Sequence, residues 1–259
     1  MSGNPGRHTP YYELVDAQTQ AGCPICRLVY KAADRYLDSL LHEAVLDPDV
    51  RAKLKESRGF CSRHTEMLRR KPGRALGVAL IYRDIIRAVS ETVGRGRYKG
   101  ESSTVSRFLG KILGKTRVRQ RPGSVLAGER VCPACAIARK AESNNIELLL
   151  AHLQDEQLHD AYAKGEGLCL PHFVRALEAV EDEESFGLLV GPQVARYRLM
   201  IRDLDEFIRK RDHRFRHEKY GEERDVWLRV LNAVVGGAGM GLSAESGGRG
   251  SPEFMDEPP

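Results

Sequence analysis

The stretches Cys23-Pro24-Ile25-Cys26 and Gly59-Phe60-Cys61-Ser62-Arg63-His64 recur later in the chain as Cys132-Pro133-Ala134-Cys135 and Gly167-Leu168-Cys169-Leu170-Pro171-His172. Each copy reads CPxC, then a spacer, then glycine, an apolar residue and CxxH. All six cysteines of the 259-residue chain lie in this pattern. Three thiols and one imidazole form a complete tetrahedral ligand set for zinc. The pattern therefore predicts what the chain binds and indicates no reaction.

We expect each repeat to build its own site. CPxC places two thiolates within one helical turn, and a hairpin of helices is expected to return CxxH to the same place. The positive end of the helix that CPxC opens favours the anionic form of the sulfurs. The predicted ligands are Cys23, Cys26, Cys61 and His64 in the first repeat, and Cys132, Cys135, Cys169 and His172 in the second.

The predicted cofactor is zinc, two ions per chain, in structural sites. A closed set of four protein ligands is typical of structural zinc, because catalytic zinc keeps an open position. No catalytic residue is therefore assigned. The leading hypothesis is a non-catalytic interaction or scaffold protein. The alternative from another class is a metalloenzyme or redox protein with iron–sulfur clusters or a labile thiolate. The simplest alternative is that the cysteines are buried in a helical core and bind no metal.

Composition indicates a protein of the reducing cytoplasm. No apolar run is long enough for a transmembrane helix, and residues 1–20 lack the basic and apolar regions of a secretory signal. Thiols remain reduced in the cytosol, where closely spaced cysteines favour metal over disulfides.

The positive charge of the chain is concentrated in one segment. The formal net charge is +5, but residues 94–130 alone contain ten Lys or Arg and two acidic residues. Apolar residues at helical spacing from Val105 to Leu113 are flanked by this charge. The segment is therefore a candidate for binding an anionic membrane surface or nucleic acid. The alternative is a connecting helix packed on the body of the protein. An unknown protein partner is also expected.

The fold class that we predict is all-α, with two duplicated helical modules, each closed by a Cys3His site, and a long C-terminal helix. A repeat period near 108 residues indicates domain duplication. The predicted organisation is a first module over 10–93, a basic linker over 94–130, a second module over 131–235 and a disordered tail over 236–259. Residues 1–20 are interpreted as a short lead-in.

Local signals place the expected helices. Asp47 followed by Pro48 predicts a helix start, and Gly59 predicts its end. Apolar residues spaced by three and four from Val190 to Ile208 predict one long helix. The other helices are expected over 28–41, 64–70, 76–93, 136–153, 155–164, 171–180 and 222–235.

Remaining polar residues are interpreted as structural. His213 and His217 have the i, i+4 spacing of a helical chelate, but neighbouring cations repel metal, so a solvated face is expected. His152 and His159 are expected at the surface. Glu183 and the next residue, also glutamate, are expected to begin a helix.

The paired CPxC…GFCxxH repeat resembles an uncharacterised family of bacterial proteins that carry two such repeats. The resemblance covers most of residues 10–235 and extends to the charged stretch Arg209-Lys210-Arg211-Asp212-His213-Arg214-Phe215. All eight predicted ligands match the repeated motif. The basic segment 94–130 is longer than the family pattern. The resemblance supports the metal motif and implies no activity.

Overall fold

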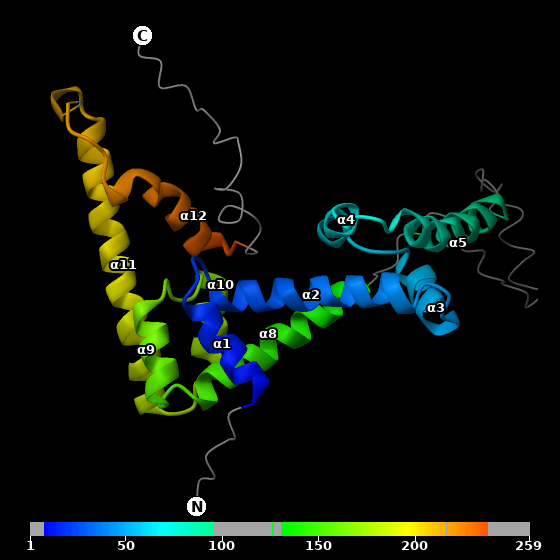
Figure 1. The fold of residues 1–259 in the computed structure, drawn as a ribbon, viewed down its shortest axis with the longest axis horizontal. Helices are drawn as coiled ribbons and strands as arrows, with labels where there is room; N and C mark the ends of the chain where they lie inside the picture. The colour runs from blue at the N-terminus through cyan, green and yellow to red at the C-terminus, as the bar shows by residue number, and fades with distance from the viewer. Residues whose placement is uncertain (1–7, 96–125, 127–130, 216, 238–259) are drawn as a thin grey trace, which may run out of the picture. The chain divides into compact units, whose positions relative to one another are not determined.

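The computed structural model describes residues 8–95, 126, 131–215 and 217–237, and over these residues it is helical and contains no strand (Figure 1). The α-helices are α1 (Thr9–Gln18), α2 (Pro24–Glu43), α3 (Pro48–Ser57), α4 (Ser62–Arg69), α5 (Ala75–Gly94), α8 (Pro133–Ala151), α9 (Glu156–Lys164), α10 (Leu170–Ala179), α11 (Glu183–Arg211) and α12 (Val226–Val235). Short 3-10 turns cover His213–Phe215 and Glu222–Asp225. The all-α prediction is confirmed. Nearly all of the basic segment and of the predicted disordered tail lies outside the described residues.

The chain forms two compact units that differ from the two sequence repeats. Unit 1 comprises residues 1–32 and 138–259, and unit 2 comprises residues 33–137. Helix α2 begins in unit 1 and ends in unit 2, whereas α8 begins in unit 2 and ends in unit 1. Each unit therefore combines the CPxC end of one repeat with the later helices of the other repeat.

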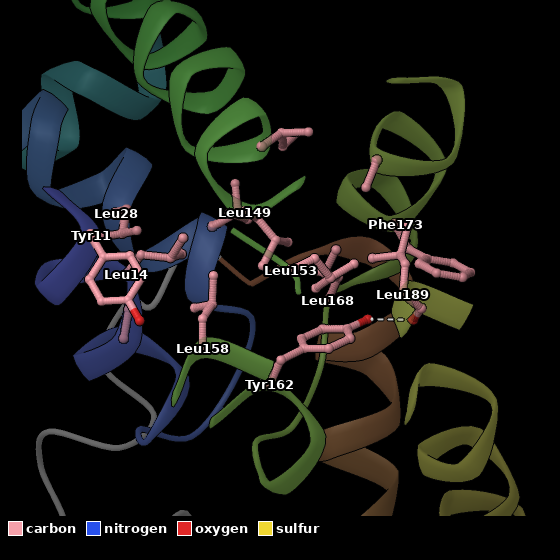
Figure 2. Close-up of a cluster of buried hydrophobic side chains, with 14 of the residues drawn as sticks. Tyr11, Leu14, Leu28, Leu149, Leu153, Leu158, Tyr162, Leu168, Phe173 and Leu189 are labelled. Atoms are coloured by element: carbon pink, nitrogen blue, oxygen red, sulfur yellow. Dashed lines mark hydrogen bonds between the residues drawn. The ribbon is translucent and has the colours of Figure 1, made fainter. Parts of the chain in front are cut away.

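The core of unit 1 joins residues from both ends of the sequence. Figure 2 shows Tyr11 and Leu14 of α1 on one side of the cluster and Phe173 and Leu189 on the other, with leucines of α8 and α9 and Tyr162 between them. The Tyr162 hydroxyl donates a hydrogen bond to the carbonyl of Leu189 at 3.0 Å. Burying such apolar side chains contributes about 1.5–3 kcal/mol each, so this cluster holds the two repeats together.

Helix α1 corrects the prediction of a simple lead-in over residues 1–20. Tyr11 and Leu14 are fully buried, and Ala17 is 1% exposed. Their spacing of three is a helical pattern, and Pro10 lies in the first turn, where its missing N–H costs no hydrogen bond. The Tyr11 hydroxyl also donates to Asp155, the residue that caps α9.

Unit 2 has buried apolar residues of its own, and three ion pairs connect its elements. Its larger buried aliphatic residues are Leu37, Leu40, Leu41, Leu54, Met67, Leu68, Ile81 and Ile85. The guanidinium of Arg51 on α3 bonds Asp84 on α5, and Lys71 pairs with Asp34 at 2.6 Å and Asp38 at 2.7 Å. These pairs join α3 to α5 and anchor the loop after α4 to α2.

Local signals located most helix ends correctly. Asp47 and Asp155 cap α3 and α9 by accepting backbone N–H groups of the first turn. Gly59 and Gly167 have positive φ angles of 86° and 75°, which glycine adopts at little cost. Glu183 begins α11, as expected.

The structure contradicts the expectation for His152 and refines the expectation for His213 and His217. His152 is 4% exposed and lies with its ring centroid 5.1 Å from that of Tyr11, so the prediction of a surface residue is wrong. His159 is partly exposed. His213 and His217 are exposed, as expected, although His213 lies in a 3-10 turn and the pair shares no helix face.

None of the described helices combines the length and the apolar character that crossing a bilayer requires.

Candidate metal centres

The eight predicted ligands gather into two Cys3His clusters, and each cluster takes two ligands from each repeat. The unit 1 cluster consists of Cys23, Cys26, Cys169 and His172, and the unit 2 cluster consists of Cys61, His64, Cys132 and Cys135. Within each cluster the ligand atoms all lie within 4.8 Å of one another. No other such group of metal-ligating side chains occurs among the described residues.

The prediction that each repeat closes its own site is therefore wrong, and helix lengths give the reason. Helix α2 has 20 residues, which span about 30 Å. Helix α3 has only 10 residues, or about 15 Å. Folded back along α2, it stops far short of Cys26, so CxxH of the first repeat stays at the far end of α2. Helices α8 and α9, with 19 and 9 residues, repeat the same mismatch.

Each cluster lies where two helices begin. Cys61 and Cys169 are the N-cap residues of α4 and α10, and Cys23 and Cys132 directly precede α2 and α8. The carbonyl of each of these four cysteines accepts the hydrogen bond of the residue four positions later. The second ligand of each motif follows in the first turn. Two positive helix ends thus face each set of thiols, which favours thiolates.

The spacing of the ligand atoms fits a single tetrahedral ion. Cys26 Sγ and Cys169 Sγ are 3.6 Å apart, and the three sulfurs of this cluster lie 3.1–3.4 Å from His172 Nδ1. Tetrahedral zinc with sulfur bonds of about 2.3 Å and nitrogen bonds of about 2.0 Å separates its sulfurs by about 3.8 Å and sulfur from nitrogen by about 3.5 Å.

The unit 2 cluster has the same geometry. Cys61 Sγ and Cys135 Sγ are 3.6 Å apart. His64 Nδ1 lies 3.2 Å from the sulfur of Cys61, 3.4 Å from that of Cys135 and 3.6 Å from that of Cys132. In both clusters the histidine Nδ1 faces the sulfurs, where it could bind an ion, and Nε2 is left for a second partner.

The two histidines differ in that second partner. His172 Nε2 lies 3.0 Å from a carboxylate oxygen of Glu142, and Arg175 donates to the other oxygen at 2.6 Å. A carboxylate behind a ligating histidine fixes its ring and raises its basicity. His64 has no carboxylate partner among the described residues. When the two repeats are aligned on their CPxC motifs, Ala33 of the first repeat occupies the position of Glu142 in the second. A carboxylate or carbonyl partner was expected for each histidine, and its identity could not be named from the sequence.

A second feature of unit 1 was absent from the sequence expectations. Gly236, directly after α12, has a φ of +77°, and a Cβ built on it would lie 3.2 Å from Cys169 Sγ and 3.6 Å from Cys26 Sγ. Helix α12 packs on α10 and α11 (Figure 1). The end of α12 thus covers two of the sulfurs, and a side chain there would be strained by the positive φ and would crowd Cys169 Sγ.

Hydrogen bonds divide the thiols of unit 2 into proton donors and acceptors. Burial raises the pKa of Cys61, but hydrogen bonds from the backbone N–H of His64 and from Cys135 outweigh burial and lower it. Burial and the hydrogen bond with Cys61 raise the pKa of Cys135 to about 12. Burial, assisted by the charge of Arg63, lowers the pKa of His64, which favours the neutral form that ligates metal.

The unit 1 thiols share protons in the same way. Burial opposes ionisation of Cys23, but hydrogen bonds from Cys169, Cys26 and His172 hold its pKa well below the ordinary value. Hydrogen bonds with Cys169 and Cys23 raise the pKa of Cys26. Burial lowers the pKa of His172, but hydrogen bonds with Cys169 and Cys23 outweigh it and raise the pKa to about 10. A bound cation would displace the shared protons.

The approach to each CxxH is fixed from a neighbouring helix. Gln193 on α11 accepts from the N–H of Leu168 at 2.9 Å and donates to its carbonyl at 3.0 Å. A Cβ at Gly167 would lie 2.6 Å from the Gln193 side chain. In unit 2, Tyr82 packs against Gly59 in the same way, with its hydroxyl oxygen 3.0 Å from the corresponding Cβ position. These contacts place Cys169 and Cys61 at the starts of their helices.

The fold and the two clusters define a helical protein with two candidate Cys3His metal centres. The chain belongs to the group described as "Family of unknown function (DUF6062)", which matches residues 10–240. It is 22% identical over 216 residues to an uncharacterized 23.9 kDa protein in the xynA 3' region of Caldicellulosiruptor sp. (strain Rt8B.4), covering 83% of this chain and 95% of that protein. No solved structure matches the chain. The resemblance to an uncharacterised bacterial family is confirmed.

Proposed function

We propose that the protein is a non-catalytic zinc-binding scaffold in which two zinc ions fasten the two repeats to each other. The observation that carries this proposal is the exchange of ligands, since each cluster pairs CPxC of one repeat with CxxH of the other. Four protein ligands leave no open position for a substrate. The ions would act as cross-links within a duplicated helical body, and the helices would present surfaces to a protein partner.

The size of the clusters favours a single ion over an iron–sulfur cluster. Ligand atoms that approach one another to 3.1–3.6 Å enclose room for one cation. A cluster with several iron and sulfide atoms would hold its cysteine sulfurs farther apart. Borderline-soft zinc suits a set of three thiolates and one imidazole.

Freshly purified protein should contain two zinc ions per chain. The reason is that both ligand sets are complete and preformed at tetrahedral spacing. Elemental analysis of protein prepared with a reductant present throughout, both aerobically and anaerobically, measures the content. A colourless protein with two zinc ions supports the proposal. A brown protein that contains iron and absorbs near 400 nm contradicts it in favour of the iron–sulfur alternative.

The basic segment 94–130 supports a second role, the binding of an anionic membrane surface or nucleic acid. The segment has ten Lys or Arg and two acidic residues, so its own positive charge exceeds the net charge of the whole chain. It contains none of the eight predicted ligands. Replacing residues 97–124 with an uncharged flexible linker should leave two metal ions and abolish binding to acidic vesicles and to DNA at low salt. Screening should weaken binding by the intact chain at physiological ionic strength. Equal binding by both proteins would exclude the segment as the anchor.

A further inference from the structure

We propose that the unit 2 cluster is a peroxide-reactive zinc–thiolate centre that releases its ion on oxidation, whereas the unit 1 cluster reacts at least tenfold more slowly. The inference rests on the proposed zinc binding and adds an activity to one of the two sites. Both clusters have the same ligands and spacing. They differ in access to solvent, in what covers the sulfurs and in what supports the histidine.

Access to solvent differs first. In the unit 2 cluster, Cys61 and Cys135 are both partly exposed. In the unit 1 cluster all four ligand groups are buried, although the Cys23 residue as a whole is partly exposed. Oxidation of cysteine follows thiolate character and exposure. A small oxidant dissolved in water therefore meets sulfur in unit 2 before it meets sulfur in unit 1.

The cover over unit 1 has no counterpart in the described part of unit 2. Gly236 lies against the sulfurs of Cys169 and Cys26. Each repeat has an equivalent set of four helices, α2–α5 in the first and α8–α11 in the second. Helix α12, which brings Gly236 to the sulfurs, follows the second set. In unit 1 the cover would also oppose ligand exchange, because an incoming molecule must first displace the end of α12.

The histidines of the two clusters also differ in the support that they receive from a carboxylate. Glu142, itself paired with Arg175, holds His172 at 3.0 Å. Loss of such a carboxylate typically weakens metal binding 10- to 100-fold. His64 has no such partner among the residues that the structure describes, so the unit 2 site is expected to hold its ion less tightly.

The reaction uses the two exposed sulfurs, which lie 3.6 Å apart. One thiolate attacks hydrogen peroxide, the O–O bond breaks, and a sulfenic acid forms with release of hydroxide. The second thiolate attacks that sulfur, the disulfide between Cys61 and Cys135 forms, and a second hydroxide leaves. The two sulfurs lose two electrons to the peroxide, and the two hydroxide ions pass to the solvent, where the acid form of the buffer protonates them. Cys132 and His64 remain, and two ligands hold zinc too weakly to retain it.

The test follows zinc release from full-length protein whose zinc content has been measured first. Hydrogen peroxide is added in excess with a chromogenic zinc chelator, and the disulfides are then mapped by mass spectrometry. We expect one zinc per chain in a fast phase, with a disulfide between Cys61 and Cys135, and the second at least tenfold more slowly. Equal rates, a first disulfide between Cys26 and Cys169, or no release from zinc-loaded protein would overturn the proposal. Protein that contains no zinc at the start would overturn the proposed function as well.

A variant pair tests the cover. Gly236→Ala places a Cβ 3.2 Å from Cys169 Sγ and strains a residue with φ +77°, so the end of α12 must move. The slow phase should become at least tenfold faster, with the fast phase unchanged. Gly73→Ala is the matched control, because Gly73 has φ +68° but nothing within 4 Å of its Cβ position. It should change neither phase. A slow phase unaffected by Gly236→Ala, or accelerated equally by both substitutions, would show that the cover does not protect unit 1.

Discussion

Replacing two cysteines with serine should remove one zinc ion when both cysteines belong to the same cluster, and both ions when they belong to different clusters. Cys26→Ser with Cys169→Ser removes two ligands from the unit 1 cluster and should leave one ion, in unit 2. Cys26→Ser with Cys61→Ser removes one ligand from each cluster. Three-ligand sites lose zinc to a competing chelator, so this pair should retain none after dialysis against one. Elemental analysis of both proteins measures the difference.

The two variants are matched controls for each other. Each replaces two cysteines with serine, and they share Cys26→Ser. Sites closed within each repeat would reverse the result, leaving no ion in the first variant and one in the second. Circular dichroism on both proteins separates metal loss from global unfolding, because the apolar core of unit 1 is expected to maintain helix after metal loss.

Much of this architecture could be predicted from short-range signals. Asp47 and Pro48 fixed the start of α3, and the four-and-three spacing up to Ile208 predicted most of α11. The apolar spacing began only at Val190, so the start of α11 was indicated instead by Glu183, where the helix begins. The residue types of the ligands were predicted in the same way, since CPxC and CxxH bring two ligands together through one helical turn.

The pairing of the motifs could not be predicted from those signals. A CPxC pair and a CxxH pair are complementary whichever repeat they come from, so ligand chemistry alone leaves two equivalent arrangements. The choice depends on the length of α2 relative to α3, which decides whether the chain returns to Cys26. The contacts of Gly236 depend on tertiary packing across more than sixty residues of sequence, and no local pattern marks them.

Cutting the chain between the repeats should leave a single complex that depends on metal. Each half carries two predicted ligands of each cluster, so both of the proposed ions would link the halves. A specific protease site inserted within residues 97–124 allows the cut after folding. The halves should elute together in reductant by size-exclusion chromatography, and chelation should weaken their association. Structural zinc contributes about 10–16 kcal/mol in small peptide sites. If even about 4 kcal/mol of this supports association, metal removal raises the dissociation constant about 1,000-fold.

The outcome distinguishes metal from apolar contacts as the link between the halves. Tyr11 and Leu14 of the first half pack with Leu149 and Leu158 of the second, so some attraction should survive chelation. Intact chain carrying the protease site, left uncut, is the control and should elute unchanged with and without chelator. Halves that separate with both ions bound would show that each repeat holds its own site. Halves whose dissociation constant is unchanged after verified metal removal would assign the link to the apolar core. A rise of three orders of magnitude identifies the two ions as cross-links between repeats, which is the role that their crossed ligand sets predict.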